Sequence, residues 1–472
     1  MKRSIFFFLA ATLLVACQSK PTREAAPVQD TAVVYMTQEI SSEALLRIFN
    51  ALGVEPQGKV AVKVSTGEPG GHNFLNAQMV KPLVDKVNGT IVECNVAYQG
   101  PRFQTETHRQ VLINHGWAAI APCDILDADA EIRIPVRDTA HIKYDLVGSH
   151  IENYDFLINL AHFKGHTAGG FGGVLKNQSI GFASRNGKVY IHTAGQQDTP
   201  EGVFWTKAEQ DHFLESMAAA ADAVHQYFNV TKNNALGTDC VRTVYIDVMN
   251  NLSVDCDCSN HPADPEMANI GILASLDPVA LDQACVDLVF NYPSTDEDNA
   301  AALIERINTR HGIHTIERAA EIGLGTRNYH LVSIDGQDML DTLNAQGLSL
   351  IVRNHGIETT YTQHGVRDLY DLQSTSILKG AAVADKVIGK GAATLMIVGG
   401  VRYATTNTIS QEALQMLQQE GVEVAYQQVV AQIPNHDNTG ECPLEQHLHG
   451  ITNPDDCLPI VNTFVESMTK NE

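Results

Sequence analysis

The sequence predicts an α/β protein: a domain built on a mostly parallel sheet with helices on both faces, followed by a smaller three-layer α/β/α domain. From residue 59 onward, segments with strand periodicity alternate with segments of helical periodicity, the order typical of a parallel sheet covered by helices. The 472 residues are also too many for one ordinary core. Finally, a polar, glycine-bounded stretch from Asp335 to Gly347 separates two such series.

The first 17 residues have the pattern of a lipoprotein signal peptide. Lys2 and Arg3 precede an apolar run from Ile5 to Ala16, which is shorter than the ~20 residues of a permanent membrane span. The run ends in Leu-Val-Ala-Cys17, which resembles the lipobox of bacterial lipoproteins, where the cysteine is lipidated. An ordinary secretory signal is the alternative. Because Gln18 follows, we expect a lipid anchor on Cys17 in the outer membrane, with the protein facing the periplasm of the cell envelope.

Residues 18–56 are interpreted as a tether and lead-in, and residues 57–335 as the first domain. The alternation of Val60, Val62 and Val64 indicates its first strand. Asp277 is a candidate cap for a helix that begins at Pro278, a residue favoured in the first turn. The predicted elements are strands over 59–66, 90–98, 154–160, 241–249 and 329–334, a short apolar run over 270–274, and helices over 75–88, 105–117, 208–228 and 278–289.

Residues 336–347 are interpreted as a linker and residues 348–472 as the second domain. The predicted elements there are strands over 348–353, 358–363, 402–409 and 422–430, with helices over 366–372, 381–397 and 411–420. The helix over 381–397 is expected to be long and rich in alanine. The tail from residue 432, with many His, Asn, Pro and Asp residues, is expected to be irregular.

Composition argues against one class of function, and cysteine spacing limits which disulfides are expected. A formal net charge of −23 without a cluster of Lys and Arg argues against nucleic-acid binding. An exported protein can pair its cysteines as disulfides. Cys256 and Cys258, with one residue between them, are expected to be poor partners for each other because so small a ring is strained. Cys442 and Cys457 are a weaker candidate pair.

A dense polar segment follows the strand predicted at 154–160. His162, Lys164 and His166 alternate, so on an extended chain they point to one side. The glycines after them let the backbone approach a ligand closely, and successive N–H groups there can form an anion-binding nest. Lys176 adds a cation for phosphate or carboxylate, with Asn177 beside it as a second contact. We interpret His162, Lys164, His166 and Lys176 as candidate catalytic residues that position a small anion or transfer protons. A solvated surface loop is the alternative.

A second cluster follows the strand predicted at 241–249. Cys256, Cys258 and His261 have the spacing of metal ligands, and thiolate with imidazole suits zinc or iron. Three local ligands leave one position for water, substrate or a distant side chain. The cluster therefore predicts one iron or zinc ion. The alternative is a pair of separate cysteines near a sheet edge.

These stretches carry a resemblance to the bacterial family called domain of unknown function 362, over residues of about 57 to 335. The matching stretches are Tyr98-Gln-Gly-Pro-Arg102, Phe156-Leu-Ile-Asn159 with His162 to His166, Gly173-Val-Leu-Lys-Asn177, Asp255-Cys-Asp-Cys258 and Gly271 to Ala284. Many relatives carry a ferredoxin-like module with two iron–sulfur clusters. Because residues 187–209 contain no cysteine, no ferredoxin-type iron–sulfur cluster is expected here. The His-Lys-His and Gly-Gly/Lys arrangement is also loosely similar to the nucleotide-pincer nickel racemases of hydroxy acids.

Residues of about 348 to 447 resemble a second family, domain of unknown function 1893, which looks like the cytidine-deaminase fold. The matching stretches are Gly365 to Tyr370, Ala384 to Ala393, Ile409-Ser410 and Cys442-Pro-Leu-Glu445. The zinc ligands of a deaminase are missing, so hydrolytic deamination by that mechanism is not expected. Lys386 and Lys390 are placed on one helical face. The candidate ligand-binding residues of this domain are Asp385, Lys386, Lys390, Ser410, Cys442 and Glu445.

The sequence thus favours an exported lipoprotein whose first domain binds a metal and acts on, or with, a small anionic molecule, with redox chemistry as one form of that action. Its only membrane contact would be the lipid anchor. The rival is a non-catalytic binding or sensory protein that uses the deaminase-like domain. A third alternative is a structural protein of the envelope with degenerate pockets.

Overall fold

The computed structural model describes residues 31–199, 208–354, 357–363, 365–435, 437 and 439–469. The predicted signal peptide, the lipidation site Cys17 and the first part of the tether therefore lie outside the described residues. Within the described ranges, no helix combines the length and the apolar character needed to cross a bilayer.

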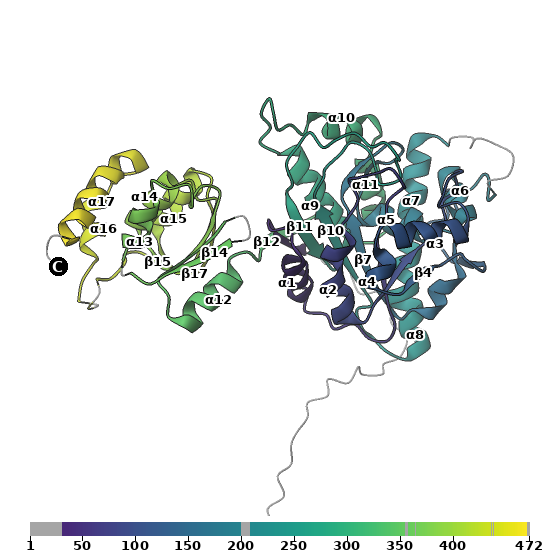
Figure 1. The fold of residues 1–472 in the computed structure, drawn as a ribbon, viewed down its shortest axis with the longest axis horizontal. Coiled ribbons are helices and arrows are strands. Elements are labelled where there is room, and N and C mark those ends of the chain that lie inside the picture. Colours follow the sequence, from purple (N-terminus) through teal and green to yellow (C-terminus); the bar gives the residue numbers. More distant parts are fainter. Residues whose placement is uncertain are drawn as a thin grey trace, which may run out of the picture. The chain divides into compact units, whose positions relative to one another are not determined.

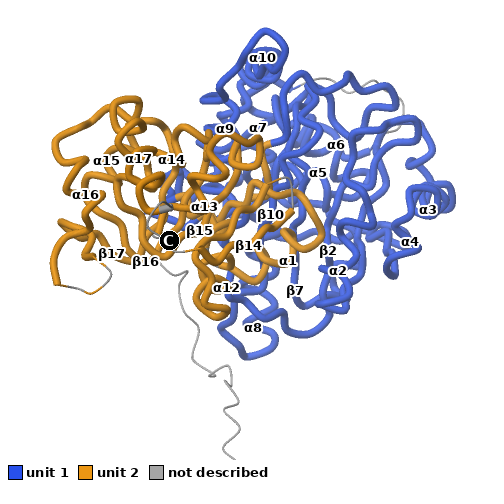
Figure 2. The backbone as a smooth tube through the Cα atoms, turned by 60° about the vertical axis from the view of Figure 1, so that its left-hand side comes forward, with its two compact units in different colours: residues 1–33, 52–269, 274–330 blue, residues 34–51, 270–273, 331–472 orange. Residues whose placement is uncertain are grey.

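The chain divides into two compact units (Figure 2). The first contains residues up to 33, 52–269 and 274–330, and the second contains residues 34–51, 270–273 and 331–472. Residues 32–51 form a strand and a helix, β1 (Ala32–Thr37) and α1 (Ser42–Ala51), where the sequence was interpreted as a lead-in.

The larger sheet has eight strands, and the part that carries the site is parallel (Figure 1). Four consecutive pairs of strands are parallel: β10 with β7, β7 with β2, β2 with β3, and β3 with β4. This confirms the predicted α/β class with a mostly parallel sheet. The strands in order across the sheet are β12 (Tyr329–Ser333), β1, β11 (Gly271–Ser275), β10 (Thr243–Met249), β7 (Phe156–His162), β2 (Val60–Lys63), β3 (Thr90–Glu93) and β4 (Cys123–Ile125).

Helices cover both faces of this sheet because its central strands are buried on both sides. Ala61, Val92 and Leu157 pack on one face in a core cluster with α5, α6 and α7. Val62, which alternates with Ala61, lies on the other face near the end of α2. The helices of the first unit are α2 (Ala77–Val87), α3 (Thr105–Asn114), α4 (Trp117–Ile120), α5 (Val174–Phe182), α6 (Arg185–His192), α7 (Gln210–Gln226), α8 (Asn233–Leu236), α9 (Pro278–Phe290), α10 (Ala301–Thr309) and α11 (Ile313–Glu321), with a 3-10 turn at Ser149–Asn153 and a π-turn at Tyr227–Lys232.

Two small hairpins accompany the sheet. One pairs β5 (Glu131–Ile134) with β6 (Asp145–Gly148), and the other pairs β8 (Lys164–His166) with β9 (Gly170–Gly172). At the start of α9, Asp277 Oδ1 accepts hydrogen bonds from Val279 N and Ala280 N at 2.9 and 3.0 Å. The predicted capping role of Asp277 is therefore confirmed.

The second unit contains a five-stranded sheet in the order β14-β13-β15-β16-β17. β13 is antiparallel to both its neighbours, whereas β15, β16 and β17 are parallel. Alternate residues of β13 face two different cores, one with α12 and one with α14, α15 and α17. The elements are α12 (Gln337–Gln346), β13 (Leu350–Asn354), β14 (Ile357–Tyr361), α13 (Arg367–Leu372), β15 (Ala382–Ile388), α14 (Lys390–Val398), β16 (Tyr403–Ser410), α15 (Gln411–Gln419), β17 (Glu423–Val430), α16 (Pro443–Leu448) and α17 (Pro454–Thr469).

Three expectations for this unit are wrong. The helix predicted over 381–397 is a strand followed by a helix, because residues 382–388 pair with β13 on one side and β16 on the other, and α14 begins only after Gly389. The predicted linker 336–347 contains α12, whose Met339, Leu340 and Leu343 are buried. The tail forms α16 and α17, which pack on the core through residues such as Leu444 and Val461.

Candidate functional site: a basic cavity beside a cysteine pair

The two segments singled out in the sequence meet because of strand order. β7 and β10 are adjacent and parallel, with His162 opposite Val248 near their carboxyl ends. The segments that follow them, the β8–β9 hairpin and residues 250–261, therefore leave the sheet at one edge. This is the edge at which open α/β sheets bind ligands.

Gly165 lets these two segments touch. Its N–H donates to Ser253 O at 2.8 Å, and a Cβ atom on this residue would lie 2.2 Å from Val254 O. Only a glycine permits the two backbones to approach so closely. The cysteine loop is thereby held against β8.

Asp257 lies between the two cysteines and holds the cysteine loop against residues His162 and Lys164. Its carboxylate accepts from His162 Nδ1 and from Lys164 Nζ, both at 2.8 Å, and all three side chains are almost wholly buried. Burial by itself would raise the pKa of Asp257, but the charges and hydrogen bonds of His162 and Lys164 lower it well below its ordinary value. The other ring nitrogen of His162 lies 2.6 Å from Asn250 O. His162 is therefore a positioning residue within this triad.

The two cysteines form a disulfide, Cys256–Cys258, which contradicts the expectation that they are poor partners. The turn closed by Ser259 N and Cys256 O at 2.9 Å brings their Cα atoms to 5.2 Å, so the chain folds before the sulfurs meet. Cys442 and Cys457, the weaker candidate pair, are both free thiols.

The third member of the sulfur cluster is His166, in place of His261. Ligand atoms of His166, Cys256 and Cys258 all lie within 4.8 Å of one another. His261 is exposed and outside this group. The physical reason is that β8 packs on the loop and carries His166 to the sulfurs. His166 Nδ1 accepts from Gly169 N at 2.9 Å and from Ala168 N at 3.3 Å, and burial followed by repulsion from Lys176 lowers its pKa well below the ordinary value.

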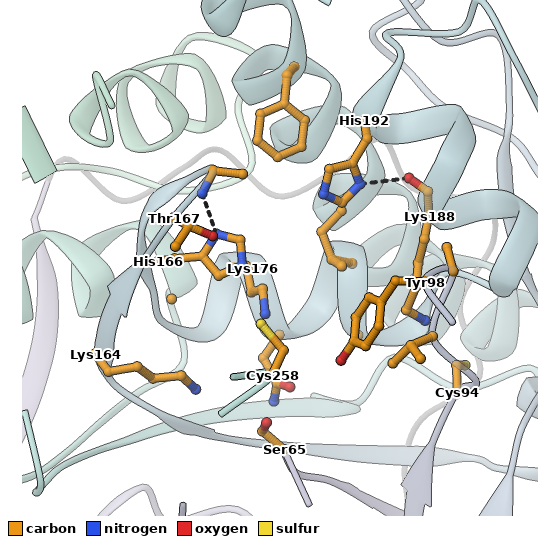
Figure 3. Close-up of a pocket in the computed structure, with 18 of the residues that line it drawn as sticks. Ser65, Cys94, Tyr98, Lys164, His166, Thr167, Lys176, Lys188, His192 and Cys258 are labelled. Atoms are coloured by element: carbon orange, nitrogen blue, oxygen red, sulfur yellow. Dashed lines mark hydrogen bonds between the residues drawn. The ribbon is translucent and has the colours of Figure 1, made fainter. Parts of the chain in front are cut away.

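Beside this cluster lies a cavity of about 430 Å³ (Figure 3). Lys164, His166, Lys176 and Asn177, all predicted site residues, line it together with Cys258; Cys256 and His162 do not. Six cationic side chains and one carboxylate line the wall. They are Lys63, Arg102, Lys164, Lys176, Lys188 and Arg310, with Glu93.

Lys176 differs from Lys63, Arg102 and Lys164, the three cavity cations that have a carboxylate partner. Lys63 and Arg102 are paired with Glu93 and Glu68, and Lys164 is paired with Asp257. Lys176 is half-buried, and its amino group has no hydrogen bond or ion pair with any residue that the structure describes. Burial, and then repulsion from Lys164, lower its pKa to about 7. An anion in the cavity would supply the missing partner.

Asn177 belongs to a buried network that the sequence did not reveal. Its Oδ1 accepts from Lys63 Nζ at 3.1 Å, and its Nδ2 donates to Asn159 Oδ1 at 2.8 Å. Lys63 also donates to Glu93 at 3.0 Å, and Lys63 with Arg102 lowers the pKa of Glu93 to about 2 although burial opposes this.

Arg102 and Tyr98 complete the far wall around Glu68. Glu68 Oε2 accepts from Arg102 Nε and Tyr98 Oη, each at 2.8 Å. From the sequence, the stretch from Tyr98 to Arg102 carries a family resemblance and predicts no role in the site. The signal that could have placed Arg102 in the site was its position after the carboxyl end of a predicted strand.

The glycines after His166, where an anion-binding nest was predicted, are used by the fold: Gly169 N donates to His166 Nδ1 at 2.9 Å, and Gly170–Gly172 form β9, which pairs with β8. The segment from Gly173 to Asn177 is the start of α5, and its N–H groups at Val174 and Leu175 donate to the two oxygens of Asp282 at 2.8 and 3.0 Å. These two N–H groups therefore already have a carboxylate partner within the protein. Gly173, Lys176 and Asn177 are the residues of this segment that line the cavity.

In the second unit, several of the predicted ligand residues serve the fold. Lys386 lies on β15 and Lys390 on α14, so the two do not share a helical face. Lys390 is buried, pairs with Glu412 and donates to Leu448 O at 2.8 Å. Glu445 accepts from Lys390 N and Gly391 N at 2.9 and 3.2 Å, and Ser410 caps α15.

The other two candidates are Asp385 and Cys442. Burial raises the pKa of Asp385 to about 7, and its carboxylate accepts from Val387 N at 3.1 Å. Cys442 is a half-buried free thiol at the start of α16. The six candidates thus comprise helix caps, a buried ion pair and strand positions.

Two family models match the chain. Residues 60–287 match "Domain of unknown function (DUF362)", and residues 338–465 match "Domain of unknown function (DUF1893)". The chain carries both domains. This confirms the two resemblances predicted from motifs, and it assigns the cavity and the cysteine pair to the DUF362 domain. No curated protein matches the chain.

Three solved structures are similar to parts of the chain. A DUF1893 family protein from Thermotoga maritima has 22% identity, with 27% of this chain and 87% of that chain covered and a TM-score of 0.26. The lactate racemase apoprotein from Thermoanaerobacterium thermosaccharolyticum has 13% identity and a TM-score of 0.31. That match covers 55% of this chain and spans 57% of the racemase chain. Another Thermotoga maritima protein has 10% identity over 93% of this chain and 84% of that chain, with a TM-score of 0.31.

Proposed function

We propose that the DUF362 domain binds a small anionic molecule in the basic cavity and acts on it through the cysteine pair. The observation that carries the binding is Lys176, a half-buried cation without an anionic partner among the described residues, in a wall with six cations and one carboxylate. A desolvated charge is costly unless it is paired, so the cavity favours a ligand that supplies the negative charge.

The chemistry is placed at the sulfur pair because Cys258 lines the same cavity and His166 lies beside both sulfurs. A disulfide next to cations is reactive toward anionic nucleophiles, since the positive field stabilises the thiolate that leaves. The cavity wall therefore combines cations that can bind an anion with a disulfide that a nucleophile can open.

Replacement of Lys176 tests the binding. In Lys176→Gln, the affinity for small carboxylates and inorganic phosphate should fall about 10- to 100-fold, because a hydrogen bond to a charged group contributes about 1.5–3 kcal/mol. Isothermal titration calorimetry with propionate, malonate and phosphate measures this. The control Lys81→Gln removes the same charge from the exposed face of α2, where Lys81 pairs only with Asp85, and should bind like the wild type. Equal affinities in all three proteins would refute the proposal.

The pH dependence of the same titration is a separate prediction. Because the pKa of Lys176 in the empty cavity is lowered to about 7, its amino group loses its charge as pH rises above 7. An anion favours the charged form and raises that pKa, so binding takes up a proton above pH 7. With propionate, which is fully ionised throughout this range, the affinity should therefore fall between pH 6.5 and 9, and Lys176→Gln should show a flat profile. A wild-type profile as flat as that of the variant would contradict the role of Lys176.

Metal binding is the second candidate function, and the sulfur–histidine cluster favours it. When the disulfide is reduced, Cys256, Cys258 and His166 are three ligands of the type that holds one zinc or iron ion, with a position left open toward the cavity. His166 would have to release its hydrogen bonds from Gly169 and Ala168, or bind through Nε2 after a change of tautomer. Reduced protein should bind about one equivalent of zinc by elemental analysis, and Cys256→Ser/Cys258→Ser should bind none. Equal metal content in the two would exclude this site.

Export as a lipoprotein remains part of the proposal. A disulfide such as Cys256–Cys258 is of the kind that persists in oxidising compartments. In a bacterial host fed an alkyne-labelled fatty acid, the wild type should incorporate the label and Cys17→Ser should not. Labelling of both, or of neither, would refute lipidation at Cys17.

A further inference from the structure

We propose that the anion acted on is a low-molecular-weight thiol with a carboxylate, and that it opens the disulfide by attack on Cys258. The inference rests on the proposed anion-binding function and assigns it a substrate class and a reacting atom. Three features carry it: the unequal exposure of the two sulfurs, the charge of the cavity and the hydrogen bonding of His166.

The two cysteines are not equivalent. Cys258 is half-buried and lines the cavity, whereas Cys256 is 3% exposed and lies outside its wall. Figure 3 shows Cys258 among the side chains that border the cavity. A small molecule in the cavity therefore reaches one sulfur of the disulfide and not the other. Thiol–disulfide exchange depends on which sulfur is accessible, so Cys258 is the point of attack and Cys256 is the leaving group.

The charge of the wall selects the thiol. Lys164, Lys176 and Cys258 all border the cavity. Lys164 is paired with Asp257, whereas Lys176 lacks an anionic partner among the described residues. A carboxylate held by Lys176 would keep a short thiol in the cavity beside Cys258. The same cations favour the thiolate form, which is the nucleophile. A cationic thiol of the same length would be repelled.

His166 is suited to assist the leaving sulfur. Its Nδ1 accepts two backbone hydrogen bonds, so the neutral ring carries its proton on Nε2. A ring nitrogen of His166 lies within 4.8 Å of both sulfurs. The imidazole therefore lies near the thiolate that forms on Cys256, and Nε2–H is the group that would donate a hydrogen bond to it once the two sulfurs separate.

The exchange balances without another reagent. The thiolate of RSH forms a bond to Cys258 Sγ as the Cys256–Cys258 bond breaks. The electron pair of that bond stays on Cys256, which takes up the proton that RSH released. A second RSH then attacks the mixed disulfide, leaves RSSR and yields the dithiol. One disulfide has been reduced and two thiols have been oxidised.

The test compares three thiols of similar length and different charge on the intact protein: 3-mercaptopropionate, 2-mercaptoethanol and cysteamine. Each rate of disulfide opening is divided by the rate at which the same thiol reacts with 4,4′-dithiodipyridine, a neutral disulfide, and this ratio corrects for the intrinsic nucleophilicity of the thiol. The anionic thiol should be at least about tenfold faster than the neutral one, and the cationic thiol slower still. Lys176→Gln should remove the preference, and Lys81→Gln should retain it. Equal corrected rates of the three thiols with wild type would overturn the proposal.

Single cysteine variants identify the reacting sulfur. Cys256→Ser, treated with the disulfide of 3-mercaptopropionate, should gain one mixed disulfide on Cys258 by mass spectrometry. Cys258→Ser should react at least tenfold more slowly, provided that circular dichroism shows it to be folded; an equal rate would overturn the assignment.

Propionate titration separates the two proposals. If propionate binds through Lys176 while the thiols show no charge preference, only this inference fails, and if propionate does not bind, the anion site fails as well.

Discussion

Replacing Asp257 by Asn should destabilise the protein by about 3–5 kcal/mol, the cost of leaving one member of a buried ion pair without its partner. Asp257 holds both His162 and Lys164 at 2.8 Å, and its side chain is almost completely buried. In Asp257→Asn, Lys164 would remain in the interior without a carboxylate. Urea unfolding monitored by circular dichroism measures the change in the free energy of unfolding. Asp264→Asn is the matched control, because Asp264 is exposed and pairs only with exposed His72; it should change stability by less than about 0.5 kcal/mol.

The effect of Asp257→Asn should depend on pH with a definite sign. Burial opposes ionisation of Asp257, but His162 and Lys164 lower its pKa below the unfolded value of about 3.9. A group with a depressed pKa contributes stability above its unfolded pKa, and that contribution is lost as pH falls toward the folded pKa. The difference between wild type and variant should therefore be full at pH 5–7 and shrink below pH 4. A difference that does not shrink would contradict the ionised state.

A second substitution checks that the cost lies in an unpaired charge. Adding Lys164→Met to Asp257→Asn removes the buried cation and should restore part of the lost stability. Lys164→Met alone completes the comparison. If Lys164→Met lowers the free energy of unfolding by the same amount in Asp257→Asn as in wild type, the two residues are not coupled.

Replacing Gly165 by Ala should cost about 1–3 kcal/mol or more and should also displace the cysteine loop. The added Cβ would lie 2.2 Å from Val254 O, a backbone atom that cannot rotate away as a side chain can. The hydrogen bond from Gly165 N to Ser253 O would lengthen as β8 and the loop separate. Unfolding in urea measures the stability, and the opening rate with 3-mercaptopropionate reports the position of the disulfide.

The control is Gly169→Ala in the same hairpin. A Cβ there would meet its neighbours at 3.5 Å or more, which is ordinary contact, so its stability should remain within about 0.5 kcal/mol of wild type. Equal stability of both alanine variants would show that β8 and the loop are free to separate.

Local patterns predicted most of the framework. The alternating valines of β2 and the mostly apolar residues of β7 could be recognised as strands because each strand buries its own residues against its neighbours. The wrong helix over 381–397 shows the limit. Alanine favours helix in isolation, but β15 pairs with β13 and β16, and sheet packing overrode that preference.

For the site, the sequence by itself determined which residue types were available and that two polar segments follow strands. It did not determine which of their members meet. His166, ninety residues before Cys256, reaches the sulfurs while His261 does not, because contact depends on the packing of β8 at Gly165. The partners of Asp257, the disulfide and the unpaired state of Lys176 were likewise decided only by the tertiary structure. Burial and charge around a side chain are sums over residues that are distant in sequence, and no local pattern contains them.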